Sequence, residues 1–217
     1  MKKIFLSLII IGMFFLSCKD EAKKSMETEV ETVTDSIVNE EPEITEVPMD
    51  SIAMQKAWEA YMTPSEPHQM MAAEVGTWTN EMTFWMAPNT PPEKSTSTGV
   101  IKMIMGGRYQ ESNHTGMTMG MPFEGRSTLA YDNATKELIS TWIDNFGTGM
   151  MVMRGTFDDS NKTITFTGNA VDPMTGKEKQ VREIYTIIDD NTRKMEMFEN
   201  GPDGKEFKNM EIMMKRK

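Results

Sequence analysis

Residues 76–217 contain a long succession of short apolar runs with a period of two, and this feature limits the possible folds most. Such alternation is typical of β-strands, because successive side chains point to opposite sides of a sheet. Examples are Trp78 with Met82 and Phe84, and Ile164 with Phe166. The pattern predicts a domain of about ten strands.

The connections between these runs exclude a parallel sheet. They are short and rich in Asp, Asn, Gly and Pro, as at residues 87–92, 106–107, 131–135, 158–162, 172–176, 189–192 and 200–204. Parallel neighbours need a crossover of a dozen or more residues, and no gap here can hold one. We therefore expect an all-β fold, an antiparallel up-and-down β-barrel whose interior can enclose a ligand. A two-sheet sandwich is the competing architecture.

Two short helices are expected before the first strand. Asp50 or Ser51 can cap the first helix, and Pro64 ends it. Ser65 can cap the second helix, whose apolar stripe continues up to Gly76. We assign residues 51–75 to short helices and residues 76–217 to the barrel domain.

The N-terminus has the pattern of a secretion signal. Lys2 and Lys3 precede an apolar run that is short for a membrane span. The residues Phe15-Leu-Ser-Cys18 then resemble the lipobox of bacterial lipoproteins, and Cys18 is the only cysteine in the chain. This resemblance implies a signal peptide at residues 1–17 and lipidation of Cys18.

Residues 18–50 are expected to form an acidic tether. From residue 19 to 50 there are eleven acidic residues and three lysines, a net charge of −8, and no aromatic residue. Such a segment buries too little apolar surface to fold. We expect attachment to the bacterial outer membrane, on its periplasmic face or at the cell surface. The chain has no basic stripe of the kind that binds nucleic acid.

The first strand opens with Gly76-Thr-Trp78, which resembles the Gly-x-Trp opening of lipocalins, whose tryptophan plugs one end of the barrel. From about Pro67 onward the chain is similar to a family of uncharacterised bacterial proteins, a domain of unknown function with a lipocalin-like barrel. The shared motifs are Gly106-Gly-Arg108, Met119-Gly-Met-Pro-Phe123, Tyr131-Asp-Asn133, Thr141-Trp-Ile-Asp144, Asp172-Pro-Met-Thr-Gly176, Arg182-Glu183 and Gly201-Pro-Asp-Gly-Lys-Glu-Phe207. The resemblance implies a fold and brings no reaction, ligand or catalytic residue.

Aromatic residues on the strands are the first candidates for a ligand-binding lining: Trp78, Phe84, Tyr131 and Trp142. Charged residues within strands are the second: Arg108, Arg126, Arg154, Arg182, Glu183, Glu196 and Glu211. An inward arginine can pair with a ligand carboxylate, and Arg182 or Arg126 is the expected clamp, with Glu196 nearby in the site. The alternation of Val181, Arg182 and Glu183 leaves open which face is inside.

Met117, Met119 and Met121 follow His114 at every second position, and thioether ligands favour Cu(I). Gly120 and Pro122 interrupt the run and indicate a hairpin connection at a barrel mouth. With 24 methionines in the chain, local enrichment is expected, and methionine also fills adaptable apolar cavities. We therefore expect no cofactor and keep the copper site as an alternative.

The chain has few residues for a histidine-based zinc site or a Ser-His-Asp triad. His68 and His114 are the only histidines, and His68 is expected on a helix surface. The leading hypothesis is a lipid-anchored envelope protein that binds a small hydrophobic or amphipathic ligand inside its barrel without catalysis. The alternatives are an interaction module whose barrel is filled by its own side chains, with an unknown protein partner, and an enzyme acting on a hydrophobic substrate.

Overall fold

The computed structural model describes residues 50–201 and 203–217, and the expected signal peptide, the lipidated Cys18 and nearly all of the tether lie outside them. Two helices, α1 (Ser51–Met62) and α2 (Glu66–Ala72), come first. The strands are β1 (Gly76–Phe84), β2 (Glu93–Ile104), β3 (Tyr109–Thr118), β4 (Met121–Asp132), β5 (Glu137–Asp144), β6 (Met151–Asp158), β7 (Thr163–Val171), β8 (Glu178–Asp189), β9 (Thr192–Asn200) and β10 (Glu206–Arg216). The predicted order of elements is confirmed.

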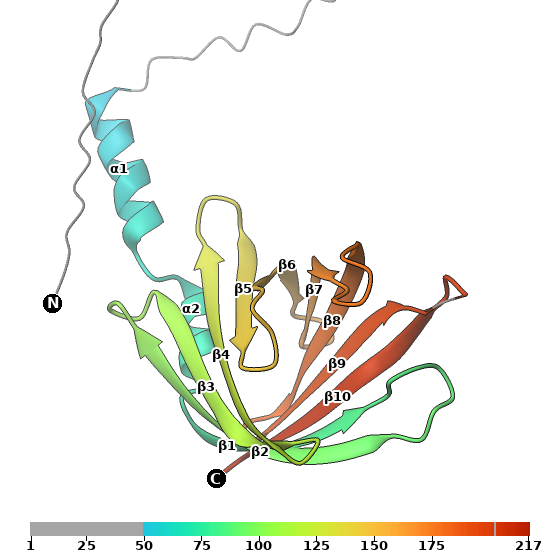
Figure 1. Ribbon diagram of the computed structural model, residues 1–217. Coiled ribbons are helices and arrows are strands. Elements are labelled where there is room, and N and C mark those ends of the chain that lie inside the picture. Colours follow the sequence, from blue (N-terminus) through green and yellow to red (C-terminus); the bar gives the residue numbers. More distant parts are fainter. Residues whose placement is uncertain (1–49, 202) are drawn as a thin grey trace, which may run out of the picture. The chain divides into compact units, whose positions relative to one another are not determined.

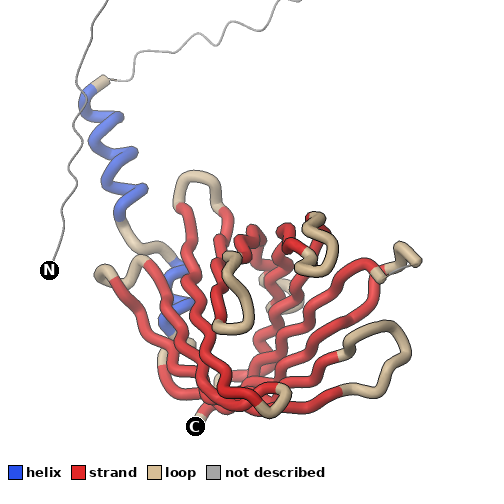
Figure 2. The backbone as a smooth tube through the Cα atoms, in the orientation of Figure 1, coloured by secondary structure: helices blue, strands red, loops and turns tan. Residues whose placement is uncertain are grey.

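The ten strands form one closed barrel in which every strand pairs with its neighbours in sequence (Figures 1 and 2). The barrel closes where β1 pairs antiparallel with β10, as in the pair Trp78 and Arg216. All ten pairings are antiparallel. The up-and-down barrel is therefore confirmed, and the two-sheet sandwich is wrong.

Strand alternation divides each strand into an inward and an outward row. On β8, Val181 and Tyr185 belong to the inward row, which decides the face that the alternation of Val181, Arg182 and Glu183 left open. On β10, Phe207 and Met213 have the same parity, so simple alternation predicts that they share one face, and this prediction is wrong. The register between β9 and β10 shifts between Lys208 and Met210, and this bulge makes Met214 the buried residue.

Helix α2 closes one end of the barrel, beside β2 and β3 (Figure 1). Its Met71 is fully buried in a core cluster with inward residues of the far strands: Leu138, Met153, Ile164, Phe166 and Val181. Trp78 is also fully buried, and its indole Nε1 donates to the Glu74 backbone oxygen at 2.8 Å. This end is therefore filled by protein side chains, and we call it the closed end.

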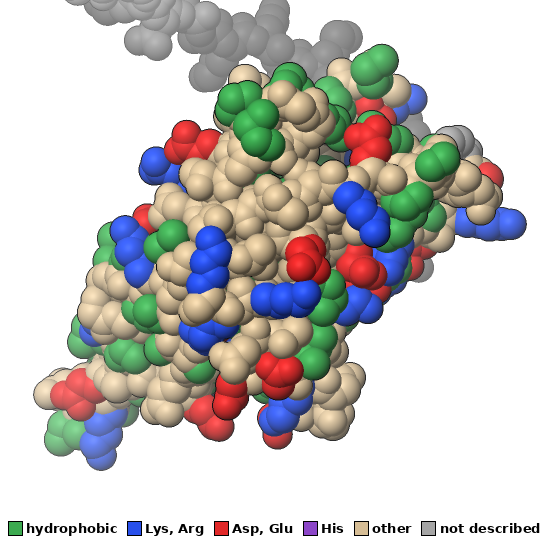
Figure 3. Space-filling model, turned by 90° about the horizontal axis from the view of Figure 1, so that it is seen from below, with side chains coloured by type: hydrophobic (Ala, Val, Ile, Leu, Met, Phe, Trp, Pro, Cys, Tyr) green, Lys and Arg blue, Asp and Glu red, His purple; other side chains and the backbone are tan. Residues whose placement is uncertain are grey.

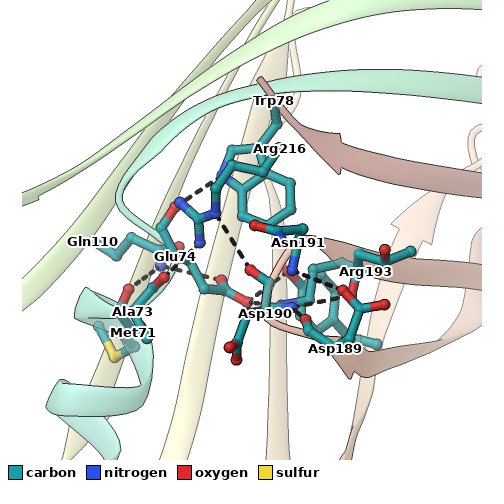
Figure 4. Close-up of polar contacts among 12 residues, drawn as sticks. Met71, Ala73, Glu74, Trp78, Gln110, Asp189, Asp190, Asn191, Arg193 and Arg216 are labelled. Atoms are coloured by element: carbon teal, nitrogen blue, oxygen red, sulfur yellow. Dashed lines mark hydrogen bonds and ion pairs between the residues drawn. The ribbon is translucent and has the colours of Figure 1, made fainter.

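Buried polar contacts hold α2 at the closed end (Figure 4). The Glu74 carboxylate accepts from Arg193 Nε at 2.8 Å, from the Tyr185 hydroxyl at 2.8 Å and from Gln110 Nε2 at 3.2 Å. Arg216 lies 4.3 Å from the Trp78 ring centre and donates to backbone oxygens of the segment after α2. One carboxylate thus ties three strands to the helix.

The prediction that His68 lies on a helix surface is wrong. The residue is buried, with 5% of its surface exposed. Its ring accepts from the Ser65 backbone nitrogen at 2.9 Å, and together the two residues form a capping box for α2. The other side of the ring meets Tyr131 edge-on, at 5.8 Å between ring centres. Burial lowers the pKa of His68, which favours the neutral ring.

Helix α1 buries none of its residues, and Ile52, Trp58 and Met62 are all more than half exposed. The contact that ties its C-terminal end to the barrel comes from Asn133, whose Nδ2 donates to the backbone oxygens of Tyr61 and Thr63. Within residues 50–201 and 203–217, neither helix is long and apolar enough to cross a membrane.

Candidate functional site: the barrel cavity

A cavity of about 430 Å³ lies inside the barrel, with lining residues from all ten strands and from α2. Its floor is made by Met70, Met71 and Glu74 at the closed end. Met119 and Phe146 line it at the other end and are about half exposed, so the cavity opens to solvent there. We call this end the mouth. The volume is in the range of small-molecule pockets.

The half of the cavity formed by β6 to β10 is apolar. Apart from Glu183 and Tyr185, its lining consists of methionine, isoleucine and phenylalanine: Met151, Ile164, Phe166, Ile187, Met195, Met197, Met210, Ile212 and Met214. Methionine is unbranched and polarisable, so such a wall adapts to guests of different shape.

The half formed by β1 to β5 is much more polar, with amide, hydroxyl and imidazole groups from Asn80, Ser97, Gln110, Ser112, His114, Thr118, Ser127 and Ser140. Alternation places these side chains inward just as it does the apolar ones. The cavity is therefore amphipathic, with a polar half facing an apolar half.

A buried hydrogen-bond chain organises the polar half. Asn80 Nδ2 donates to Ser97 Oγ and to His114 Nδ1, each at 3.0 Å. His114 Nε2 lies 3.0 Å from Ser112 Oγ. Burial lowers the pKa of His114 to about 4, so the ring is neutral at pH 7, and its accepting Nδ1 leaves the proton on Nε2.

Among the described residues, this hydrogen-bond chain leaves one acceptor without a partner, the side-chain oxygen of Asn80. Asn80 is 2% exposed, yet its Oδ1 has no hydrogen-bond partner within the described part of the chain. A buried polar atom without a partner is costly, and few native side chains carry one. Asn80 is also among the residues that line the cavity, so the free acceptor belongs to the cavity wall.

Aromatic rings surround the mouth. Trp142 lies 6.3 Å from Phe123 in a stacked arrangement and 5.4 Å from the His114 ring, and Phe123 also meets Phe146 at 5.7 Å. The Trp142 indole donates to Asp144 Oδ2 at 2.7 Å, which fixes its orientation. Gly125 makes room for the indole, since a Cβ there would lie 2.5 Å from Trp142 Cζ2.

Glu183 places a carboxyl group on the otherwise apolar half. It pairs across the ladder with Phe166 on β7 and Met197 on β9, both cavity-lining. Burial raises its pKa to about 7, and no described residue offers it a hydrogen bond or an ion pair. The cavity therefore contains an unpaired carboxyl group.

The structure brings two of the expected aromatic residues, Phe84 and Trp142, to the cavity lining. Trp78 is instead packed at the closed end between Arg216 and Arg193. Tyr131 packs against the core cluster and His68 and is not among the lining residues. The Trp78 and Tyr131 side chains point into the barrel, as the alternation requires, but they lie nearer the closed end than the cavity does.

The expected carboxylate clamp does not face the cavity, because Arg126, Arg182 and Glu196 all lie in outward rows. Arg126 is exposed beside Glu124 at 3.4 Å, and Arg182 pairs with Glu206 at 2.6 Å. Glu196 is held between two lysines, Lys194 at 3.0 Å and Lys208 at 2.9 Å. Figure 3 shows such acidic and basic side chains interspersed over the face in view.

The copper alternative finds no assembled site. His114 lies inside the barrel with both ring nitrogens in hydrogen bonds, whereas Met117 is on the outward row of β3 and 53% exposed. Met119 lies in the β3–β4 turn with φ of 51°, and Met121 begins β4. Within residues 50–201 and 203–217, no group of three or more His, Cys, Asp or Glu side chains is placed to hold a metal ion.

Sequence reasoning named Glu183 among the charged strand residues but chose Arg182 and Arg126 as the clamp, and it missed Asn80 and Asp144 as cavity residues. The signal for Glu183 was present, since Val181 and Tyr185 share its parity and are the apolar residues that a core face requires. Asn80 likewise lies between Trp78 and Met82 on the inward row of β1. Polar residues at these parities mark a lined cavity and not a dry core.

Comparison with known proteins agrees with the barrel. A family described as "Protein of unknown function (DUF1579)" matches residues 63–216, which confirms the resemblance seen in the motifs. The crystal structure of Rv2717c from M. tuberculosis is similar in fold, with 13% identity, a TM-score of 0.54, and coverage of 71% of this chain and 99% of that chain. A redesigned β-barrel matches with 14% identity, a TM-score of 0.35, and coverage of 68% and 94%. No curated protein matches the sequence.

Proposed function

Since the chain belongs to the DUF1579 family, whose barrel here surrounds a cavity, we propose that it binds a small hydrophobic or amphipathic molecule inside the barrel without catalysis. The observation that carries this proposal is the cavity of about 430 Å³ with one apolar and one polar half. Such a division matches a molecule that has an apolar chain and a polar head.

The cavity speaks against the alternative of a barrel filled by its own side chains. Packed protein interiors contain few voids larger than a water molecule. A filled core is present here as two clusters, one around Met71 and one around Trp78 at the closed end.

Catalysis is less well supported than binding. Glu183 has the raised pKa that a general acid or base needs, but no described residue forms a hydrogen bond with it. The His114 ring, the other candidate, has both nitrogens engaged by Asn80 and Ser112. Ser112 Oγ lies 3.0 Å from His114 Nε2, but His114 Nδ1 accepts from Asn80, so Nε2 carries the proton and does not act as a base toward the hydroxyl.

The proposed place of action is the bacterial cell envelope, with the barrel tethered to the outer membrane through lipidated Cys18. This part of the proposal rests on the signal-like residues 1–17, the lipobox resemblance and the acidic segment that follows. A ligand carried by such a protein would be one that partitions between membranes and the periplasm or the cell exterior.

Native mass spectrometry of the full chain carrying Cys18→Ser tests the binding proposal. We expect an added organic mass, retained from the cell or gained from a mixture of apolar amphiphiles, that is lost on denaturation. Ser127→Trp should fill the cavity and abolish the added mass, because Ser127 lines it. The matched control is Thr128→Trp, the next residue on β4, which lies in the outward row. A bare mass for the wild-type protein with every amphiphile would contradict the proposal.

A further inference from the structure

We propose that the barrel cavity selects amphiphiles with a cationic amine head group and rejects fatty acids, with Glu183 as the group that binds the ammonium. This inference rests on the proposed function and deepens it by naming the ligand class. It reverses the expectation of an arginine clamp for carboxylates, because it is Glu183 and not Arg182 that points inward.

The charged side chains that line the cavity, among the described residues, are all acidic. No lysine or arginine is among its lining residues within 50–201 and 203–217, whereas Glu74, Asp144 and Glu183 are. Glu74 is already paired with Arg193, at 2.8 Å. Asp144 accepts from the Trp142 indole and from the Phe146 backbone nitrogen. Glu183 is left without a partner.

The surroundings of Glu183 make a cation the fitting partner. The carboxyl group lies between Phe166 and Met197 on neighbouring strands, in the half of the cavity that offers no hydrogen-bond donor near it. An ionised carboxylate in such a place is poorly solvated, and pairing with a ligand cation compensates it. A ligand carboxylate would add a second unpaired negative charge.

The opposite wall also favours donors in the ligand. Four strands separate β3 from β8 in either direction round the barrel, so the Ser112 and His114 side chains face the Glu183 strand across the cavity. On that polar half, among the residues that the structure describes, the one buried side-chain atom without a hydrogen-bond partner is an acceptor, Asn80 Oδ1. An ammonium group carries three donors and no acceptor, and an amine head group therefore suits both walls.

Binding of the cation should depend on pH through Glu183. Other titratable or charged groups lie on the elements around the cavity. On the same side they are Tyr185 on β8, Arg193 and Glu199 on β9, and Glu74 after α2; Glu199 pairs with Lys179 and Glu74 with Arg193. Across the cavity they are His114 and Asp144. The pKa of His114 is about 4 and that of Tyr185 is raised, so neither changes charge between pH 6 and 8. Since the pKa of Glu183 is about 7, amine affinity should fall about tenfold from pH 8 to pH 6.

The test compares dodecylamine, dodecanol and dodecanoate, below their micelle-forming concentrations, by displacement of an uncharged fluorescent probe from the full chain carrying Cys18→Ser. The amine should bind at least about tenfold more tightly than the alcohol, and the acid more weakly than either. Glu183→Gln should bring amine affinity down to that of the alcohol and remove the pH dependence. Glu183→Leu provides a second variant, and circular dichroism checks the fold of each.

Glu178→Gln is the matched control, because Glu178 is an exposed glutamate on the same strand, hydrogen-bonded to Asn169 at 3.1 Å. It should bind like the wild type. Equal affinity for all three ligands, or unchanged amine affinity in Glu183→Gln, overturns the inference but leaves the proposed function standing. Failure of the probe and of all three ligands to bind overturns both.

Discussion

At the scale of single residues, Glu183 and His114 are expected to affect stability in opposite directions. Burial raises the pKa of Glu183 from 4.5 to about 7, so between these values the folded protein keeps a proton that the unfolded chain loses. Its contribution to stability therefore falls as pH rises through this window. Burial lowers the pKa of His114 from 6.5 to about 4, so its contribution rises with pH between these values.

The two effects nearly cancel between pH 4.5 and 6.5 in the wild-type protein. In Glu183→Gln, of these two effects only that of His114 remains. Between pH 4.5 and 6.5 the free energy of unfolding of this variant should therefore increase, relative to that of the wild type, by up to about 3 kcal/mol. In His114→Gln it should fall by a similar amount. Urea denaturation at a series of pH values measures both differences. Curves for the two variants that run parallel to the wild-type curve would contradict the assignment.

Gly125 is the second residue with a specific expected effect. An alanine Cβ would lie 2.5 and 2.6 Å from two atoms of the Trp142 ring, so the indole must move away from the mouth. We expect Gly125→Ala to cost about 1–3 kcal/mol and to weaken ligand binding. Gly149→Ala is the control, because nothing lies within 4 Å of the added Cβ. Thermal denaturation and probe binding report the two effects, and a Gly125→Ala protein indistinguishable from the control would refute this role.

At the scale of elements, α2 depends on the buried ion pair between Glu74 and Arg193, whose side chains are 8% and 4% exposed. Removing one partner leaves the other charge buried and unpaired. Glu74→Gln should therefore cost about 3–5 kcal/mol of unfolding free energy, measured by urea denaturation. Glu81→Gln removes one partner of an exposed pair with Lys215, and should cost less than about 1 kcal/mol. Equal costs for the two would show that the buried pair does not hold the helix.

The elements themselves were largely predictable from the chain, and their faces less so. Both helices follow from their caps and prolines, and the strands follow from period two. A shift of one residue in the pairing register of β8 would turn its inward row outward. Arg182 would then face the cavity and Glu183 the solvent. The bulge at Lys208 changes the inward row of β10 and has no clear signal in the sequence.

At the scale of the whole barrel, closure follows from the chain: ten strands with short connections leave no sheet edge exposed once the first pairs with the last. The cavity does not follow in the same way, because its size depends on how far α2 and its Met71 fill the closed end. The division into a polar and an apolar half was also unexpected. The division depends on the barrel order, which places β1 to β5, with most of the polar lining residues, on one side of the cavity.

The most direct test of the central claim is a crystal structure of the protein grown with dodecylamine labelled with bromine on its chain. The anomalous signal of bromine gives the position of the ligand without assuming it. We predict a bromine peak inside the barrel, near the apolar half that includes Met195 and Met197, with the amine beside Glu183. Bromine peaks confined to the outer surface, with the cavity occupied by water, would contradict the account.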